Sequence, residues 1–246
     1  VTVPAVSDWY GLYWPDASPD NSRLHYCDVR YAGAGNGAAL TFLSATDSVS
    51  NSVIRRSYYG IDCQGTAAPV LVNTSIEAST LTPIVLDFTA APVFSSLVFS
   101  SANNGYDAFG LRGGTLTGAT SLPKRGATVG INPVSNVTYV LLSSLTINVG
   151  ASLTVSPGVV IKPLGGQSIQ VNGNLTMDGT AAVGDTITIT SIADDNFGTP
   201  NDTNNNGSIT APNRGDWNRI VFAQGATGSI SRCRFKFGTN SNTCLL

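Results

Sequence analysis

The sequence predicts an all-β chain in which short strands recur in stacked coils of about 22 residues. Three observations predict this class: a shortage of charged residues, an internal repeat, and alternation of apolar and polar side chains within the repeat. Only 11% of the 246 residues are charged, against about 25% in an average soluble domain. The chain has three lysines and one glutamate, and is rich in Gly, Ser, Thr, Asn and Val. Helix-rich folds are therefore excluded.

The clearest repeat lies in the second half of the chain. Residues 145–155 align with residues 167–177 at an offset of 22, and apolar residues alternate with polar ones in both segments. Alternation predicts short strands with one buried face, and the constant offset predicts that each coil lies on the previous one. The matched apolar pairs are Ile147 with Ile169, Val149 with Val171, Leu153 with Leu175, and Val155 with Met177.

A looser form of the same repeat occupies the first half. The segments 51–54, 73–76 and 95–98 follow one another at the same offset, which pairs Ile54 with Ile76 and Ile76 with Val98. Gly, Asn and Pro lie between the alternating runs, as expected where the corners of a coil need a positive or a fixed φ.

A longer repeat overlies the short one. Residues 1–12 match residues 209–220 without a gap, so that Trp9 corresponds to Trp217, and residues 24–31 match residues 230–237 after a slip of two positions. We therefore expect residues 1–246 to form one continuous solenoid, in which residues 1–208 are one long repeat unit and residues 209–246 begin a second. Neither end has the pattern of an amphipathic helix that would cap an exposed strand edge, so we expect further coils to follow there.

Three motifs carry a resemblance to a known family: the run at 153–162, the run at 171–180, and Gly-Asp-Trp at 215–217 followed by a strand containing Cys233. With them the sequence resembles the right-handed parallel β-helix repeat segments of secreted bacterial and archaeal surface proteins. The resemblance implies that fold over most of the chain. It does not imply one activity, because adhesins, structural stalks and polysaccharide enzymes share the architecture.

Charge and hydropathy exclude several partners and suggest a location. The net charge is −2 and the longest basic run is Arg55-Arg56, so we expect no nucleic-acid partner. No apolar run approaches the roughly 20 residues that a membrane-spanning helix needs, so we expect no membrane insertion. Few lysines and four cysteines suit an extracellular or cell-surface location, where disulfides form. The cysteines allow three pairings, and the sequence does not choose between them: Cys27, Cys63, Cys233 and Cys244.

One stretch has the composition of a calcium site. The pattern Asp-x-Asn-x-Asn-Gly at 202–207 fits the first half of an oxygen-rich calcium loop, but the twelfth position is Asn213 rather than glutamate. Other nearby carboxylates would have to supply the missing charge. The same composition also suits a turn-rich excursion that binds no ion. The candidate ligands are Asp194, Asp195, Asp202, Asn204, Asn206 and Asp216.

An enzymatic function is the alternative hypothesis. A polysaccharide hydrolase or lyase needs carboxylates, or a base beside a carboxylate, that converge across one groove. Arg30 and Arg55 have a spacing that would place them on adjacent coils, although a charged outer face explains them better. The candidate catalytic residues are Asp28, Arg30, Arg55 and Asp62. For glycan binding, the candidates are the aromatic residues Trp9, Tyr10, Tyr13 and Trp14. Tyr10 and Trp14 are the better ones, because Trp9 recurs as Trp217 in the long repeat.

Sparse carboxylates and self-similar ends favour a non-catalytic role. We expect an extracellular structural solenoid whose partners are copies of itself, stacked end to end into a filament, or the adjoining repeats of a long adhesive surface protein. Five sequons allow glycosylation in a host that performs it: Asn73, Asn136, Asn174, Asn201 and Asn206.

Overall fold

The computed structural model describes residues 3–16, 22–43, 45–100 and 104–239. Within them the chain is nearly all-β, with one short 3-10 helix, η1 (Ala34–Asn36). None of the described residues forms a helix long and apolar enough to cross a membrane. The chain divides into two compact units, which are residues 1–110 with 126–135, and residues 111–125 with 136–246. The division between the two units lies near residue 110 and not at residue 209, where the second long repeat unit is expected to begin. The long repeat therefore stays a prediction.

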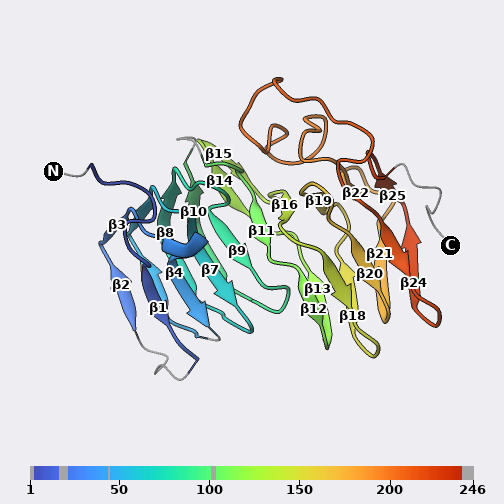
Figure 1. Ribbon diagram of the computed structural model, residues 1–246, viewed down its shortest axis with the longest axis horizontal. Helices are drawn as coiled ribbons and strands as arrows, with labels where there is room; N and C mark the ends of the chain where they lie inside the picture. Colours follow the sequence, from blue (N-terminus) through green and yellow to red (C-terminus); the bar gives the residue numbers. More distant parts are fainter. Residues whose placement is uncertain (1–2, 17–21, 44, 101–103, 240–246) are drawn as a thin grey trace. The chain divides into compact units, whose positions relative to one another are not determined.

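Unit 1 alternates between two sheets (Figure 1). The first sheet has the order β1 (Leu12–Trp14), β4 (Ala38–Leu43), β7 (Tyr59–Gln64), β9 (Ile84–Leu86), β11 (Phe109–Leu111). The second has the order β2 (Arg23–His25), β5 (Ser48–Ser50), β8 (Val70–Glu77), β10 (Val93–Phe99), β14 (Ala127–Val129), β15 (Asn132–Val134), with β3 (Asp28–Arg30) paired to β6 (Val53–Arg55) and β6 paired to β8. Neighbouring strands are parallel from β1 to β9 and from β2 to β14, whereas β14 and β15 are antiparallel.

In unit 2, successive strands along the chain join three parallel sheets in turn (Figure 1). One sheet contains β16 (Tyr139–Leu141), β19 (Val160–Pro163), β22 (Ile187–Ile189) and β25 (Cys233–Phe235). The next has the order β12 (Gly114–Leu116), β17 (Leu145–Ile147), β20 (Ile169–Val171), β23 (Ile220–Phe222). The third has the order β13 (Ala119–Leu122), β18 (Ser152–Val155), β21 (Asn174–Asp178), β24 (Thr227–Ser231). The prediction of an all-β chain with stacked parallel strands is confirmed, and this order is compatible with a β-helix.

Alternation along the strands produces the core of each unit. In β21 the side chains of Leu175 and Met177 are buried, whereas their neighbours are partly exposed. Burying a Leu or Phe side chain stabilises the folded state by about 1.5–3 kcal/mol. Fully buried residues include Phe42, Ile54, Ile61, Leu71, Ile76 and Phe99 in unit 1, and Tyr139, Ile147, Val171, Leu175, Ile187 and Ile189 in unit 2.

The predicted register is correct for one strand pair of the clear repeat. Leu153 lies opposite Leu175, and Val155 lies opposite Met177, as predicted.

The register of the preceding strand pair is shifted by two positions. Ile147 lies opposite Val171, so the predicted pairs Ile147–Ile169 and Val149–Val171 are wrong. The reason is that the turn after Ile147 is longer by two positions than the turn after Val171. A slip of two keeps the side chains of a strand on their predicted face, because the strand period is two. Val149 itself lies in the longer turn and is exposed.

A second register error changes the face. Ile54 lies opposite Ile76 as predicted, but the next partner of Ile76 is Phe99, and Val98 lies opposite Ser75. A slip of one position exchanges the inner and outer faces. Phe99 is therefore the buried residue, and Val98 is only half-buried.

Sharp corners in unit 1 use residues with positive φ. Asn51 and Asn73 have φ of 49° and 46°, and Asn73 Nδ2 donates a hydrogen bond to Asn51 Oδ1 at 2.7 Å. Tyr26 and Ser96 take the same conformation with φ of 54° each. The asparagines follow the usual preference for this region, and neither Tyr26 nor Ser96 was foreseen as a corner residue.

Candidate functional site

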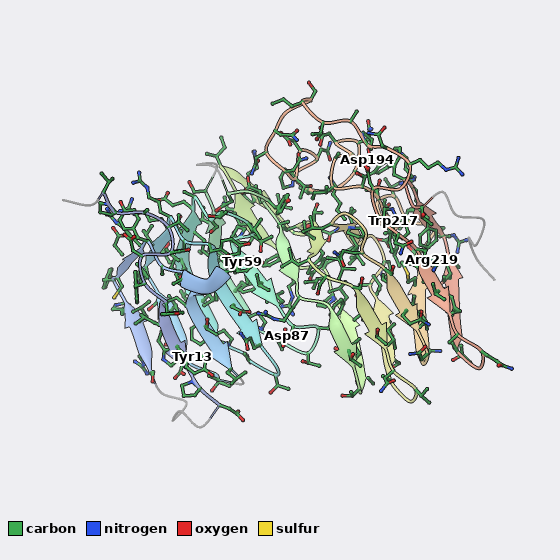
Figure 2. The ribbon with its side chains drawn as sticks, viewed as in Figure 1. Tyr13, Tyr59, Asp87, Asp194, Trp217 and Arg219 are labelled. Atoms are coloured by element: carbon green, nitrogen blue, oxygen red, sulfur yellow. The ribbon has the colours of Figure 1, made fainter. Side chains whose placement is uncertain are left out.

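The segment between β22 and β23, residues 190–219, wraps around a buried lysine. Lys162 belongs to β19, its side chain is completely buried, and its Nζ donates to the backbone carbonyls of Asp194 and Asn201, each at 2.9 Å. Burial lowers the pKa of Lys162 to about 8, against the opposing attraction of Asp195, Asp194 and Asp202. Figure 2 shows Asp194 within this segment. The sequence signal for this lysine was its rarity and its place after the apolar run 159–161.

Asp194 is a structural carboxylate. It is completely buried, accepts hydrogen bonds from Thr190 Oγ1 at 2.5 Å and Asn196 N at 3.2 Å, and lies 3.4 Å from Lys236 Nζ. Burial acts to raise its pKa, but the hydrogen bonds from Thr190 and Asn196 and the charge of Lys236 outweigh burial and lower the pKa. Its charge is therefore compensated by partners within the chain.

Asp216 also accepts hydrogen bonds from groups of its own chain. Its Oδ2 accepts a hydrogen bond from Asn213 N at 2.8 Å and another from the hydroxyl of Ser191. Among the described residues, no group of three His, Cys, Asp or Glu side chains is arranged to hold a metal ion. Asp194 and Asp216 thus have other roles, and the remaining candidate ligands are Asp195, Asp202, Asn204 and Asn206.

Asp202 shapes the loop that follows it. Its Oδ1 accepts a hydrogen bond from Asn206 N at 3.1 Å, and its Oδ2 accepts one from Gly207 N at 2.8 Å. The side-chain amides of Asn204 and Asn206 both donate to Thr210 Oγ1, at 3.3 and 2.7 Å. Thr210 therefore brings the two asparagine side chains together at one hydroxyl.

Three of the four candidate catalytic residues come together, and Asp62 lies apart from them. Arg30 and Arg55 are register partners on β3 and β6, as their spacing predicted, and both donate to Asp28. Arg55 also donates to Glu77 Oε1 at 3.2 Å. Asp62 is on β7 in the other sheet of the unit, where it is buried and accepts a hydrogen bond from Gln64 Nε2 at 2.7 Å.

The charges of this cluster neutralise one another. Hydrogen bonds from Arg30 and Arg55 hold the pKa of Asp28 well below its usual range. A general acid or base needs a pKa near the working pH, so Asp28 is unsuited to that role. The arrangement acts as a charged ladder along the outer face of three strands.

The aromatic candidates divide into packed and exposed residues. Trp14 stacks on Phe42 with 4.7 Å between ring centroids, which assigns it to packing. Tyr10 and Tyr13 are 80% and 59% exposed. Tyr10 therefore remains a candidate for stacking on a sugar ring.

The two matching tryptophans have matching hydrogen bonds. Trp9 Nε1 donates to Arg30 O at 2.8 Å, and Trp217 Nε1 donates to Lys236 O at 2.7 Å. The backbone N–H three positions before each Asp also matches, since Ala5 N donates to Asp8 and Asn213 N donates to Asp216. We call residues 5–31 the N-terminal Trp motif and residues 213–237 the C-terminal Trp motif.

The remaining residues singled out in the sequence are the cysteines and the sequon asparagines. No disulfide joins Cys27, Cys63 and Cys233 to one another within the described part of the chain, and Cys244 lies outside it, so any bridge to Cys244 stays a prediction. The side-chain amides of four sequon asparagines already donate hydrogen bonds: Asn73 to Asn51, Asn136 to Gly158 O, Asn174 to Thr227, and Asn206 to Thr210.

In comparisons with known proteins, no family model, no curated protein and no solved structure matches the chain.

Proposed function

We propose that this chain is a structural, non-catalytic part of an extracellular right-handed parallel β-helix, whose coils continue from one copy to the next or along a longer chain. The supporting observation is the different pairing of the two Trp motifs. Strands β1, β2 and β3 of the N-terminal motif pair with the strands that follow them, β4, β5 and β6. Strands β23, β24 and β25 of the C-terminal motif pair with the strands that precede them, β20, β21 and β22.

The same motif thus pairs with a neighbouring coil on either side, and within the described residues each copy of the motif uses only one of its two sides. Within the described residues, β1, β2, β23, β24 and β25 are edge strands of their sheets. Edge strands present unpaired N–H and C=O groups that another strand can bind. A second copy of this chain, offering its N-terminal motif to the C-terminal motif of the first, would satisfy both edges.

Charge supports this partner. The two motifs carry opposite excesses of charge, and opposite charges favour encounter and orientation. The exposed rings of Trp9 and Tyr13 supply apolar area that a neighbouring coil would cover. The N-terminal motif contains Asp8, Asp16, Asp20 and Asp28 against Arg23 and Arg30, and the C-terminal motif contains Arg214, Arg219, Arg232, Arg234 and Lys236 against Asp216.

Sedimentation velocity over a range of protein concentrations, with electron microscopy, tests the proposal. We expect concentration-dependent oligomers, and we expect Tyr13→Asp to abolish them because it adds a charge to an exposed edge position. Val183→Asp is the matched control, since Val183 is fully exposed outside both motifs. A chain that stays monomeric at every concentration would contradict stacking between copies. Intact mass of native material then tests the longer chain, which requires a mass well above 25.5 kDa.

Glycan binding is the second candidate, favoured by the exposure of Tyr10. It predicts binding in a polysaccharide panel that is lost in Tyr10→Ala. An enzymatic version predicts turnover that is lost in Arg30→Ala, Arg55→Ala or Asp62→Ala.

A further inference from the structure

Three oxygen atoms in the segment between β22 and β23 are buried without a hydrogen bond. Asp195 Oδ1, Asn204 Oδ1 and Asn206 Oδ1 each expose less than 1 Å² and have no hydrogen-bond partner in the described part of the chain. Buried polar atoms are nearly always bonded, and an unbonded one indicates a ligand or water. One carboxylate oxygen and two amide oxygens within residues 195–206 are therefore open to a partner that binds oxygen atoms.

The side-chain amides of the two asparagines meet at one hydroxyl. Because both Nδ2 atoms donate to Thr210 Oγ1, the Oδ1 atoms of Asn204 and Asn206 point away from that hydroxyl. Asp202 lies at the start of the same turn. Burial, and after it the negative charge of Asp202, raises the pKa of Asp195, so the two carboxylates interact. Two carboxylates and two amide oxygens therefore belong to one neighbourhood.

Lys162 does not satisfy these oxygens. Its ammonium donates to the backbone carbonyls of Asp194 and Asn201, and within the described chain it makes no hydrogen bond to any of the three buried oxygens. Its charge nevertheless lies close enough to attract Asp195 and Asp202. The positive charge of Lys162 would therefore lower the affinity of these oxygens for a cation.

We propose that Asp195, Asp202, Asn204 and Asn206 bind one calcium ion through their side-chain oxygens. Calcium takes six to eight oxygen ligands in flexible geometry, and water fills positions that the protein leaves open. Magnesium demands a smaller, nearly ideal octahedron and keeps its waters. With two carboxylates and a nearby ammonium, we expect a Kd on the order of 10⁻⁴ to 10⁻³ M, the range of extracellular modules. This site is independent of coil stacking.

Calorimetric titration of the full chain with calcium chloride, after dialysis against a chelator, tests the proposal. Thermal unfolding is followed in parallel by circular dichroism. We expect saturable binding to one site and a rise in Tm with calcium, because a ligand of the folded state stabilises it. Magnesium chloride at the same concentration is expected to give a much smaller rise.

Two variants distinguish this site from a general effect of charge. Asn204→Asp keeps the side-chain size and adds a charge at the proposed ligand, so its Kd for calcium is expected to fall about tenfold and its Tm without calcium to fall. Ser208→Asp adds the same charge at an exposed position of the loop and is expected to change the Kd less than threefold. Asn204→Ala is expected to lose saturable binding.

The proposal is overturned if the wild-type chain shows no saturable heat and no Tm shift, or if Asn204→Asp and Ser208→Asp respond equally. An equal response to magnesium would also overturn it.

Discussion

The two Trp motifs have the same local geometry and different surroundings. In both, the indole N–H binds a backbone carbonyl at the end of the third strand of the motif, and the residue after that carbonyl, Tyr31 or Phe237, has φ of 61°. Yet Trp9 is 38% exposed and Trp217 is 4% exposed. The two motifs therefore share their hydrogen bonds and differ in how far their surroundings cover the indole ring.

Equivalent positions also recruit different charged partners. Arg30 binds Asp28 within its own strand, whereas Lys236, at the matching position, lies beside Asp194 and over the rings of Phe197 and Phe237. The segment that precedes Trp217 has thus replaced an exposed ion pair by a partly buried one.

Replacing each tryptophan by alanine gives the largest expected difference. We expect Trp217→Ala to lower the free energy of unfolding by about 3–5 kcal/mol, because it removes a large buried side chain and leaves a cavity. Trp9→Ala is expected to cost less than half as much, because its ring is partly in solvent. Urea unfolding of both variants measures the two values. Equal losses would show that burial is the same in solution and would break the comparison.

Lys162→Met tests what holds the segment before Trp217. We expect a loss of about 2 kcal/mol, since two buried carbonyls lose their donor. Because the folded chain binds this proton less tightly than the unfolded chain, stability of the wild type should rise from about pH 8 toward the usual lysine pKa. Unfolding measured from pH 7 to pH 10.5 should show this rise in the wild type and not in Lys162→Met. A parallel pH profile in the two proteins would refute a buried, titrating lysine.

Asp28→Asn gives the smallest expected effect, below about 1 kcal/mol, because the ladder is exposed to solvent. Since the pKa of Asp28 is lowered on folding, its contribution is present above its usual pKa and is lost as the pH falls below it. Chemical unfolding at pH 6 and pH 3 should show a difference between wild type and variant at pH 6 that shrinks at pH 3. A loss several times larger would mean that the N-terminal motif depends on this ladder as the C-terminal motif depends on burial.

The sequence was sufficient for the strand class and for part of the register. Alternation shows which side chains face inward, and it placed Leu153 and Leu175 opposite each other. It carries no information on the length of each turn, so Ile147 and Val98 were assigned wrong partners. Lys162 was missed because its burial depends on carbonyls that lie on a distant, later segment of the chain.

The segment before β23 has a consequence for how such a chain changes over evolutionary time. Ile169 pairs on one side with Leu145, a single ordinary coil earlier, and on the other side with Ile220, which follows the whole of segment 190–219. Both pairs keep the same parallel register. A coil can therefore gain a full coil's length of new chain at one corner while the strands on either side keep their partners. Corners are positions where insertions are inherited at little structural cost, so new binding properties can arise there while the stack itself remains unchanged.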